Sequence, residues 1–449
     1  MNILIIGAGE VGSHLANLLS RENHNITIVD NDPEKVARIS ETLDVLAIEG
    51  LGTSPSTLKE AGIEHSDMVI AVTTVDEVNV LACMVAKHFG VKTKIARVRN
   101  REFTRHSGFL DPAELGIDLV IHPELEATRE IVRLVRFPNA IEMITFCEGK
   151  IAVVGTKVLE NAPAAGKQLH ELGGGDGDRL LFRVIAISRD GATLIPRGQD
   201  RIESGDELYV TCHTEDLKQV FALAGHEQRE THYVMLYGAT AIGRMVAEEL
   251  EQDRDLHIKL IEGDPERGKE VAEDLDNVQV VLGDASDIDL ITREGIIDQD
   301  VFAALSNDDE NNIVTSLLAR HLRVPKTITL IGKSDYAPIV KTIGLDVAIN
   351  PRLLTSNAIL KYIRHGEIVS LRHMAGVNAE TYEFQVSATS KVVGKKIRDI
   401  SFPKDSIVVA VAHRDGPEIP VGDTKIYVGD KVVIFCLPDA VGPILKLFE

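Results

Sequence analysis

Short apolar runs alternate with amphipathic stretches from residue 2 to residue 122. Continuous apolar runs are typical of parallel strands covered on both faces. In the stretch 10–20, the apolar side chains fall on one stripe of a helix. This alternation predicts a doubly wound parallel sheet. The expected strands are Asn2–Ile6, Asn25–Asp30, Asp44–Glu49, Asp67–Thr74, Thr93–Val98 and Ile117–His122, and the expected helices are Glu10–Ser20, Pro33–Thr42 and Glu77–Phe89.

The whole pattern occurs twice. "AVTTVDEVN" (71–79) aligns with "ALSNDDENN" (304–312), so that Asn79 meets Asn312. "GIDLVIHP" (116–123) aligns with "GLDVAINP" (344–351), and "RDGATLIPRG" recurs near the end as "RDGPEIPVG". Blocks that keep their order at a constant shift indicate one duplicated module of about 225 residues.

Each module divides again, because short strands among turns replace the strand–helix pattern near residues 141 and 369. The fold class expected is therefore α/β, with two tandem Rossmann-like doubly wound domains, each followed by a small α+β domain. The predicted domains are 1–140, 141–228, 229–368 and 369–449.

The formal net charge of -21 argues against nucleic acid as a partner and against an anionic bilayer, since both would repel the chain. It suits a basic protein surface, such as the cytoplasmic loops of membrane proteins. No apolar run approaches the roughly 18 residues of a membrane helix, and a strand pattern at the very start predicts no signal peptide. The four cysteines form no CxxC pair and are expected to be buried thiols in a reducing cytoplasm.

A GxGxxG motif, Gly7-Ala8-Gly9-Glu10-Val11-Gly12, follows the first strand and opens the first helix. In such a turn the first glycine makes the bend, the second lets the backbone approach a pyrophosphate, and the third lets the helix pack closely. The helix N-terminus offers free N–H groups to phosphates. Asp30 ends the next strand, where its carboxylate would accept ribose hydroxyls and repel a 2′-phosphate. The motif therefore favours NAD(H) or an adenosine nucleotide over NADP(H).

Further candidates follow the other strands at the same edge of the sheet. The glycines would leave room for an adenine, and threonine hydroxyls can donate to phosphate or ribose. Arg97 and Arg99 either neutralise a phosphate or belong to a basic solvated face. Besides the motif and Asp30, the candidate residues of the first copy are Asn31, Gly50, Gly52, Thr73, Thr74, Glu77 and Arg97.

The second copy has an altered turn, in which Thr240 replaces the middle glycine. We expect its side chain to stand where a pyrophosphate would approach. Arg97 and Arg99 are replaced by Leu330 and Gly332, whereas Glu262 keeps the acidic position. Glu262, Gly283 and Asp284 remain candidates for holding an adenosine end. The duplication predicts one regulated site and one that is mainly structural or differently liganded.

No catalytic motif accompanies the nucleotide motif. A dehydrogenase needs a proton donor or acceptor beside the nicotinamide, and His170, His213 and His413 have no evident acidic partner in the sequence. We therefore expect no enzyme activity, and a ligand that acts by shifting conformational populations. An NAD-dependent oxidoreductase and a stand-alone nucleotide sensor with a soluble partner are the alternatives.

The motifs "IIGAGEVGSHLA" with Asp30, "AVTTVDEVNVLA", "IARVR" and "GIDLVIHPE", in their order, resemble the TrkA family of Trk potassium-uptake regulators, which carry tandem regulator-of-K⁺-conductance (RCK) domains. The resemblance covers nearly the whole chain. It implies a cytoplasmic subunit, peripheral on the inner face of the membrane, that binds NAD(H), ADP or ATP and gates a potassium translocator of the TrkH or TrkG type. It also implies a homodimer or homotetramer ring. Thr240 departs from the family's usual glycine and puts a second nucleotide site in doubt.

Two apolar helices are expected after the completed sheets, at 123–137 and 351–363. Given the resemblance, they could pack across subunits. Burial within the chain, between large and small domains, is the alternative.

Overall fold

The structure is a computed structural model that describes residues 1–21, 24–103, 111–172, 175–176, 179–227, 230–333, 336–363, 368–374, 377 and 379–448. The chain forms two compact units. The first comprises Met1–Arg129, Leu330–Ala337 and Ile349–Tyr362, and the second comprises Glu130–Thr329, Pro338–Ala348 and Ile363–Glu449. The domain boundaries predicted at residues 140, 228 and 368 stay predictions, and residues 228 and 229 lie outside the described part of the chain.

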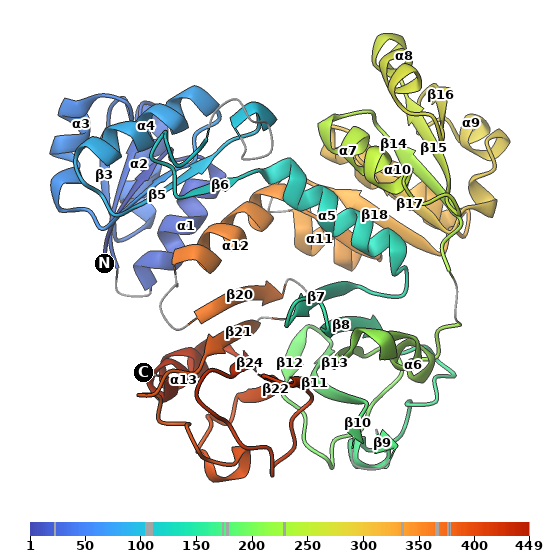
Figure 1. The fold of residues 1–449 in the computed structure, drawn as a ribbon. Helices are drawn as coiled ribbons and strands as arrows, with labels where there is room; N and C mark the ends of the chain where they lie inside the picture. Colours follow the sequence, from blue (N-terminus) through green and yellow to red (C-terminus); the bar gives the residue numbers. More distant parts are fainter. Residues whose placement is uncertain are drawn as a thin grey trace. The chain divides into compact units, whose positions relative to one another are not determined.

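The first large domain is a six-stranded parallel sheet in the order β3-β2-β1-β4-β5-β6. Figure 1 shows strands of this sheet. The central strands are almost entirely buried, as their continuous apolar sequences require. The elements are β1 (Asn2–Ile6), α1 (Glu10–Arg21), β2 (Asn25–Asp30), α2 (Pro33–Thr42), β3 (Leu46–Glu49), α3 (Pro55–Glu60), β4 (Met68–Ala71), α4 (Asp76–His88), β5 (Thr93–Arg97), β6 (Leu119–Ile121) and α5 (Pro123–Arg136).

The doubly wound sheet predicted from the apolar runs is confirmed, and the predicted elements differ from the observed ones only at their ends. The sequence analysis did not anticipate α3. This helix is six residues long and has proline in its first turn, and only Leu58 among its side chains is buried. One buried position is too few to produce a helical periodicity.

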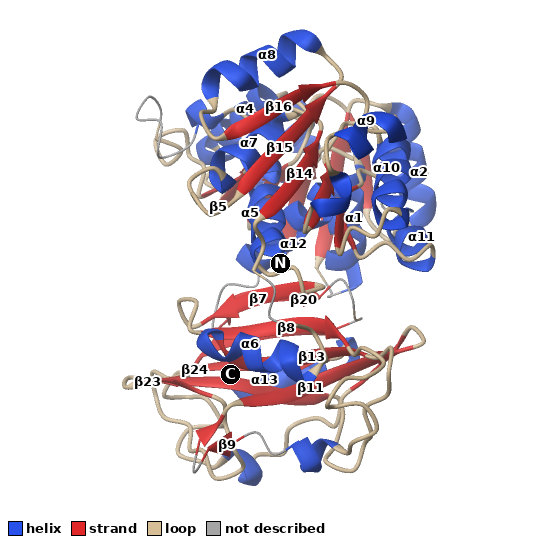
Figure 2. Cartoon of the chain, turned by 90° about the vertical axis from the view of Figure 1, so that its right-hand side faces the viewer, coloured by secondary structure: helices blue, strands red, loops and turns tan. Residues whose placement is uncertain are grey.

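The second large domain repeats the first, with the strand order β16-β15-β14-β17-β18-β19. Figure 2 shows β14, β15 and β16 running in the same direction, as their parallel pairing requires. The elements are β14 (Tyr233–Tyr237), α7 (Ala241–Leu250), β15 (His257–Glu262), α8 (Pro265–Asp274), β16 (Val278–Leu282), α9 (Ile288–Arg293), β17 (Val301–Ala304), α10 (Asp309–His321), β18 (Lys326–Leu330), α11 (Tyr336–Thr342), β19 (Val347–Ile349) and α12 (Pro351–Ile363).

Each small domain is built on a five-stranded antiparallel sheet, in the orders β12-β11-β13-β8-β7 and β20-β21-β24-β22-β23. The two domains share one hydrophobic core, in which Val153 and Tyr209 of the first pack with Val409 and Phe435 of the second. The elements are β7 (Glu142–Phe146), β8 (Ile151–Lys157), β9 (Gly175–Asp176), β10 (Arg179–Leu180), β11 (Phe182–Arg189), β12 (Ala192–Leu194), β13 (Glu207–His213), α6 (Leu217–Leu223), β20 (Ile368–Met374), β21 (Ala379–Gln385), β22 (Ser406–His413), β23 (Gly416–Glu418), β24 (Lys431–Cys436) and α13 (Val441–Phe448).

At the helices α5 and α12, the division into compact units does not follow the boundary between the two copies. Residues 349–362, which follow the last strand of the second sheet, group with the first unit, and the end of α5 groups with the second. Val135 and Ile359 are fully buried within the single chain. For these side chains the structure supports burial within the chain, rather than the packing across subunits that the resemblance suggested.

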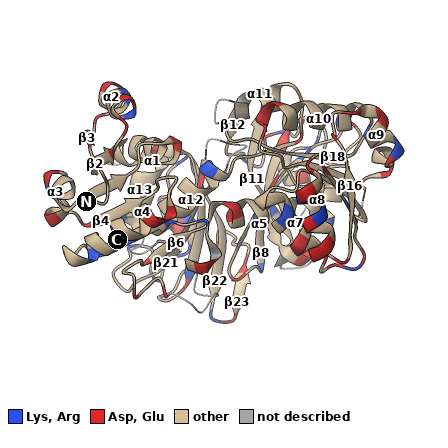
Figure 3. Cartoon of the chain, turned by 90° about the horizontal axis from the view of Figure 1, so that it is seen from above, with Lys and Arg blue, Asp and Glu red and all other residues tan. Residues whose placement is uncertain are grey.

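All four cysteines are buried, as expected, and burial raises the pKa of the Cys83 thiol to about 12. None of the described helices is both long and apolar enough to cross a bilayer. Charged residues of both signs lie along α8, whose red and blue segments are visible in Figure 3. Pairs such as Lys269 and Glu273, 3.7 Å apart, mark this helix face as solvated.

Candidate functional site

A cavity of about 540 Å³ opens at the carboxyl edge of the first sheet, within the first unit. Eleven of the residues predicted from the sequence line it: Gly7, Gly9, Glu10, Val11, Asp30, Asn31, Gly50, Gly52, Thr73, Thr74 and Arg97. Ala8 and Gly12 belong to the same turn without lining the cavity. Glu77 is exposed on α4 and does not line it either.

The turn after β1 needs its glycines for two different reasons. Gly7 has φ +107°, and a Cβ there would lie 3.0 Å from the amide nitrogen of Thr73. A Cβ on Gly12 would lie 1.8 Å from the carbonyl oxygen of Gly7, so α1 can pack this closely only without a side chain. A Cβ on Gly9, in contrast, would meet nothing within 4 Å. The middle glycine therefore leaves the backbone bare toward open space, which is the feature a pyrophosphate uses.

Asp30 braces this turn. Its Oδ2 accepts a hydrogen bond from the amide of Ala8 (2.6 Å), and its Oδ1 accepts one from the amide of Asp32 (2.9 Å). The ammonium group of Lys35 lies 3.9 Å from Oδ1. The carboxylate is thus held at the cavity wall with lone pairs left for further donors.

Gly50 and Gly52, which follow β3, lack side chains for a reason other than the one expected from the sequence. A Cβ on Gly52 would lie 2.2 Å from the Ile6 side chain, and one on Gly50 would lie 2.5 Å from that of Thr57. The missing side chains therefore make room for protein atoms in those directions, although both backbones line the cavity.

The ends of β4 and β5 are tied together by Asn79, which is fully buried on α4. Its Oδ1 accepts hydrogen bonds from the hydroxyl (2.8 Å) and the amide (2.9 Å) of Thr73, and its Nδ2 donates to the carbonyl of Arg97 (2.8 Å). The Thr73 hydroxyl, expected to donate to a ligand, donates to Asn79 instead. The recurrence of this asparagine as Asn312 was the sequence signal for the residue.

Arg97 is the least satisfied polar group of the site. Its Nε is buried and makes no hydrogen bond within the described part of the chain. Burial, and after it the charge of Arg99, lower the pKa of the Arg97 guanidinium. A buried cation without an acceptor is costly, and an anion in the cavity would supply the missing partner. Of the two interpretations left open, the buried Nε favours a role toward an anion over a fully solvated face for this arginine.

The cavity is electropositive in a strongly acidic chain. Four basic side chains, Lys35, Arg97, Arg99 and Arg352, line it together with two acidic ones, Glu10 and Asp30. Arg99 lies 3.8 Å from Glu124 and donates to the carbonyl of Thr74 (3.3 Å). The sequence analysis missed Arg352, because this residue lies far along the chain in the second copy.

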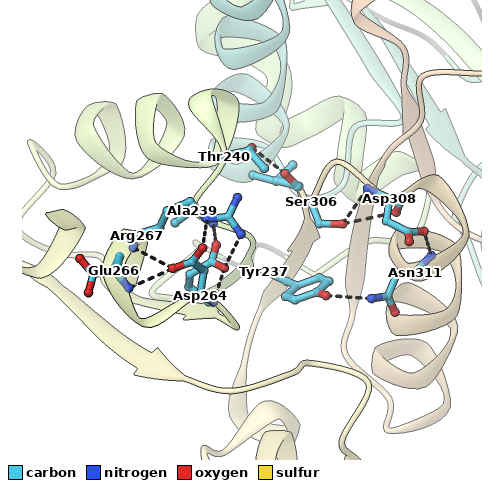
Figure 4. A network of polar contacts seen from close by, with 11 residues as sticks. Tyr237, Ala239, Thr240, Asp264, Glu266, Arg267, Ser306, Asp308 and Asn311 are labelled. Atoms are coloured by element: carbon cyan, nitrogen blue, oxygen red, sulfur yellow. Dashed lines mark hydrogen bonds and ion pairs between the residues drawn. The ribbon is translucent and has the colours of Figure 1, made fainter. Parts of the chain in front are cut away.

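In the second copy, polar groups at the equivalent edge are engaged with one another (Figure 4). Glu262 is buried and accepts hydrogen bonds from the amide of Ala239 (2.6 Å) and from the guanidinium of Arg267 (3.0 Å). The hydroxyl of Tyr237 accepts a hydrogen bond from the Asn311 side chain (2.9 Å).

Thr240 stands at the start of α7, where its side chain is held by the protein itself. Its side chain is buried, and its hydroxyl donates to the carbonyl of Leu305 (2.7 Å) and accepts from the amide of Gly243 (3.2 Å). It thus caps α7 and uses an N–H that a phosphate would otherwise take. The other two candidates are held in a turn: a Cβ on Gly283 would lie 2.4 Å from the Leu290 side chain, and Asp284 accepts from the amide of Ser286 (2.8 Å).

The expectation that His413 lacks an acidic partner is wrong. Its Nδ1 lies 2.9 Å from Asp430 and its Nε2 lies 3.7 Å from Glu418. His413 ends β22, Glu418 ends the neighbouring strand β23, and Asp430 directly precedes β24. They belong to the second unit, whereas the cavity belongs to the first.

Comparisons with known proteins agree with this duplicated architecture. A model described as the TrkA-N domain matches residues 3–123 and again residues 234–351, which together exceed half of the chain. The chain belongs to the TrkA family. A second model, described as the TrkA-C domain, matches residues 153–225 and 381–449 of this TrkA-family chain. The resemblance noted from the sequence motifs is confirmed.

Curated relatives match over the full length. The chain is 35% identical to "Trk system potassium uptake protein TrkA homolog 1" of Methanosarcina mazei, over 100% of both chains. It is 36% identical to "Trk system potassium uptake protein TrkA" of Halomonas elongata, over 97% of this chain and 96% of that one.

Solved structures share the fold. The crystal structure of the GsuK RCK domain aligns with 100% of this chain and 94% of its own, with a TM-score of 0.61 and 18% identity. The GsuK channel bound to NAD aligns with a TM-score of 0.61 over 100% of this chain and 78% of its own, also at 18% identity. At this identity the likeness concerns the fold.

Proposed function

We propose that this TrkA-family chain is the nucleotide-sensing regulatory subunit of a potassium uptake system. It binds one NAD(H), ADP or ATP molecule per chain at the first copy and converts the ligand's identity into a domain movement. The movement gates a membrane potassium translocator of the TrkH or TrkG type. The subunit works in the cytoplasm, at the inner face of the membrane, as a homodimer or homotetramer ring, and it performs no chemistry on the nucleotide.

The observation that carries the proposal is the buried Nε of Arg97, which has no hydrogen-bond partner in the described part of the chain and lies at the wall of an electropositive cavity. Gly9 leaves the neighbouring backbone open, and the N-terminus of α1 directs free N–H groups toward the same edge. Asp30 is positioned to accept from a ribose. These groups fit an adenine nucleotide with two or more phosphates, and the relative whose structure is described as bound to NAD supports the choice.

The second copy has a structural role in this proposal. Its acidic residue is paired with Arg267 and its turn is capped by Thr240. Because both groups are satisfied internally, a ligand would have to break these interactions before making its own. We therefore place no nucleotide at Glu262, Gly283 and Asp284.

The energetics favour an assembly of several chains. Driving a two-state gate from nearly closed to nearly open needs about 5.5 kcal/mol of differential binding. One allosteric site typically supplies about 1–3 kcal/mol. A ring that combines the sites of several subunits reaches the required total, whereas one chain does not.

The first test is binding to the purified full-length chain. A ligand that binds only the native state raises the unfolding midpoint, so a thermal-shift panel of NAD, NADH, ADP, ATP and AMP should show stabilisation. Calorimetry should then give about one nucleotide per chain. A chain that no adenine nucleotide stabilises would refute the sensor function.

The second test measures transport. The chain is co-expressed with a TrkH-type translocator in cells that lack their own potassium uptake systems. Uptake should require the chain and should fall in a variant that no longer binds nucleotide. Consumption of NADH by the purified chain would instead favour the oxidoreductase alternative, and recovery of only soluble partners would favour the stand-alone sensor.

A further inference from the structure

We propose that Arg352, a residue of the second copy, completes the nucleotide site of the first and recognises the terminal phosphate of a triphosphate. The inference rests on the proposed function and adds to it a residue that distinguishes ATP from NAD. It also identifies the element through which the second copy would sense the ligand.

The backbone of Arg352 is fixed by the start of α12. Asn350 caps this helix, since its Oδ1 accepts hydrogen bonds from the amides of Arg352 (2.9 Å) and Leu353 (3.3 Å). Pro351 occupies the first helical position, where its fixed φ suits a helix start. The segment belongs to the same compact unit as the cavity, so Arg352 lines the site from a well-defined position.

The side chain of Arg352 forms a close ion pair with Glu10, the first residue of α1. Both side chains are nearly half exposed, at 43% and 46%. Glu10 stands at a helix N-terminus, which favours negative charge and is also where a phosphate would bind. The carboxylate and an entering phosphate repel each other, and Arg352 is the group that compensates Glu10.

Arg352 is one of three arginines whose side chains line the cavity. Arg97 is largely buried, Arg99 is held near Glu124, and Arg352 lies near enough to Arg97 to affect its titration. In NAD each phosphate is bonded to a ribose on one side and to the second phosphate on the other. ATP, in contrast, ends in a free phosphate that carries additional charge. A planar guanidinium binds such a group through two parallel hydrogen bonds. On binding of the triphosphate, Arg352 exchanges Glu10 for the terminal phosphate.

The ion pair between Glu10 and Arg352 has no counterpart with the roles of the two copies exchanged. In the alignment of "GIDLVIHPE" with "GLDVAINPR", Arg352 corresponds to Glu124, and Glu10 corresponds to Ala241. The position therefore carries an acid in the first copy and a base in the second. This reversal suits a device in which the second copy reads the ligand of the first.

The test is calorimetric titration of the intact chain with ATP, ADP and NADH. Four variants are compared with the native chain: Arg352→Ala, Arg352→Lys, Glu10→Gln and Arg129→Ala. Arg129 serves as the matched control, because it is exposed and paired with Glu126 (3.1 Å) in the same unit, away from the cavity lining.

Arg352→Ala should lower the affinity for ATP about tenfold, since a charge-assisted bidentate contact is lost. It should change the affinity for NADH by less than about twofold. Arg352→Lys should recover part of the ATP affinity, because it keeps the charge without the fork. Glu10→Gln should strengthen ATP about threefold by removing the competing carboxylate. Arg129→Ala should alter none of the affinities.

Three results overturn the inference. Equal losses for ATP and NADH in Arg352→Ala would assign the residue a merely structural role. An unchanged ATP affinity would remove Arg352 from the site, while NADH binding left the proposed function standing. If no nucleotide binds the native chain, the proposed function fails and the inference with it. Should Arg352→Ala not fold, an unchanged or weaker ATP affinity in Glu10→Gln decides against the exchange.

Discussion

The two large domains share one strand order, yet their carboxyl edges have opposite characters. In the first, Arg97 has a buried nitrogen without an acceptor, and Gly9 leaves the turn open. In the second, the hydroxyl of Thr240 caps the helix and Arg267 pairs with Glu262. The comparison teaches that two sheets with the same strand order can differ in whether the polar groups at this edge already have partners inside the protein. Under the proposed function, this difference determines which copy binds a nucleotide.

Two further substitutions between the copies accompany this difference, one at the end of a strand and one in a loop. The position of Ile6 is taken by Tyr237, whose hydroxyl reaches Asn311, and the position of Gly52 is taken by Ala285, which is fully buried. Gly52 accommodates Ile6 at a distance where a Cβ would clash. Each copy has therefore adjusted neighbouring residues together, as close packing demands.

The largest effect is expected from the third glycine of each turn. In Gly12→Ala and Gly243→Ala the new Cβ would lie 1.8 Å and 1.9 Å from the carbonyl oxygens of Gly7 and Gly238. Each variant should lose about 3 kcal/mol of unfolding free energy, measured by urea denaturation. Only Gly12→Ala should abolish nucleotide binding. Equal loss of binding in both variants would break the proposed difference between the copies.

Replacement of Arg97 should change nucleotide affinity and the stability of the ligand-free chain in opposite directions. Arg97→Met should weaken ATP about tenfold to a hundredfold, and ATP more than adenosine, because a charged hydrogen-bonding partner is lost. The ligand-free chain should gain about 1 kcal/mol, since a costly buried charge disappears. Calorimetry and urea denaturation give the two quantities. Equal losses for ATP and adenosine would remove Arg97 from the phosphate role.

Asp30 and Glu262, the acidic residues at equivalent positions of the two copies, can each be replaced by the amide of the same size. Asp30→Asn should weaken NADH and ATP alike, by about tenfold, because both ligands carry an adenosine ribose and the carboxylate accepts more strongly than the amide. Glu262→Gln should leave binding unchanged and lower stability by about 1–2 kcal/mol, since the buried ion pair with Arg267 is broken. Unchanged affinity in Asp30→Asn would refute its placement at the ribose.

The smallest effect is expected from restoring the glycine of the second turn. Thr240→Gly removes the helix cap and the hydrogen bond to Leu305, at a cost of about 0.5–1 kcal/mol. It should not create a second site, because Glu262 stays paired with Arg267 and no arginine replaces Leu330. Calorimetry should still give about one nucleotide per chain, and a rise to two would show that Thr240 alone blocks the second copy.

Much of the fold could be predicted from the sequence, because apolar runs and glycine turns are local signals. The six-stranded sheets and the duplication followed from periodicity and from ordered motifs. The position of α12 could not be predicted in this way. Its grouping with the first unit depends on contacts between residues separated by the length of a whole module.

The candidate site was predicted in outline for the same reason. Gly7, Gly9 and Asp30 lie in one strand–turn–helix segment, so their spacing carried the information. Arg352 was missed because it comes from the other copy. The contacts of Thr240 with Leu305 and of His413 with Asp430 were missed because they join segments that are separated along the chain. The reason for Gly50 and Gly52 likewise became visible only from the atoms beside them.

The shared core of the small domains has a consequence for how the two copies diverged. Val153 and Tyr209 of one copy are covered by Val409 and Phe435 of the other, and the intervening chain tethers them. Dilution cannot dissociate such a pair, since its halves remain at a high effective concentration. Fusion thereby guarantees that each first copy meets a second copy with a different carboxyl edge. Under the proposed function, the second copy can then lack a nucleotide while the pair of copies stays intact.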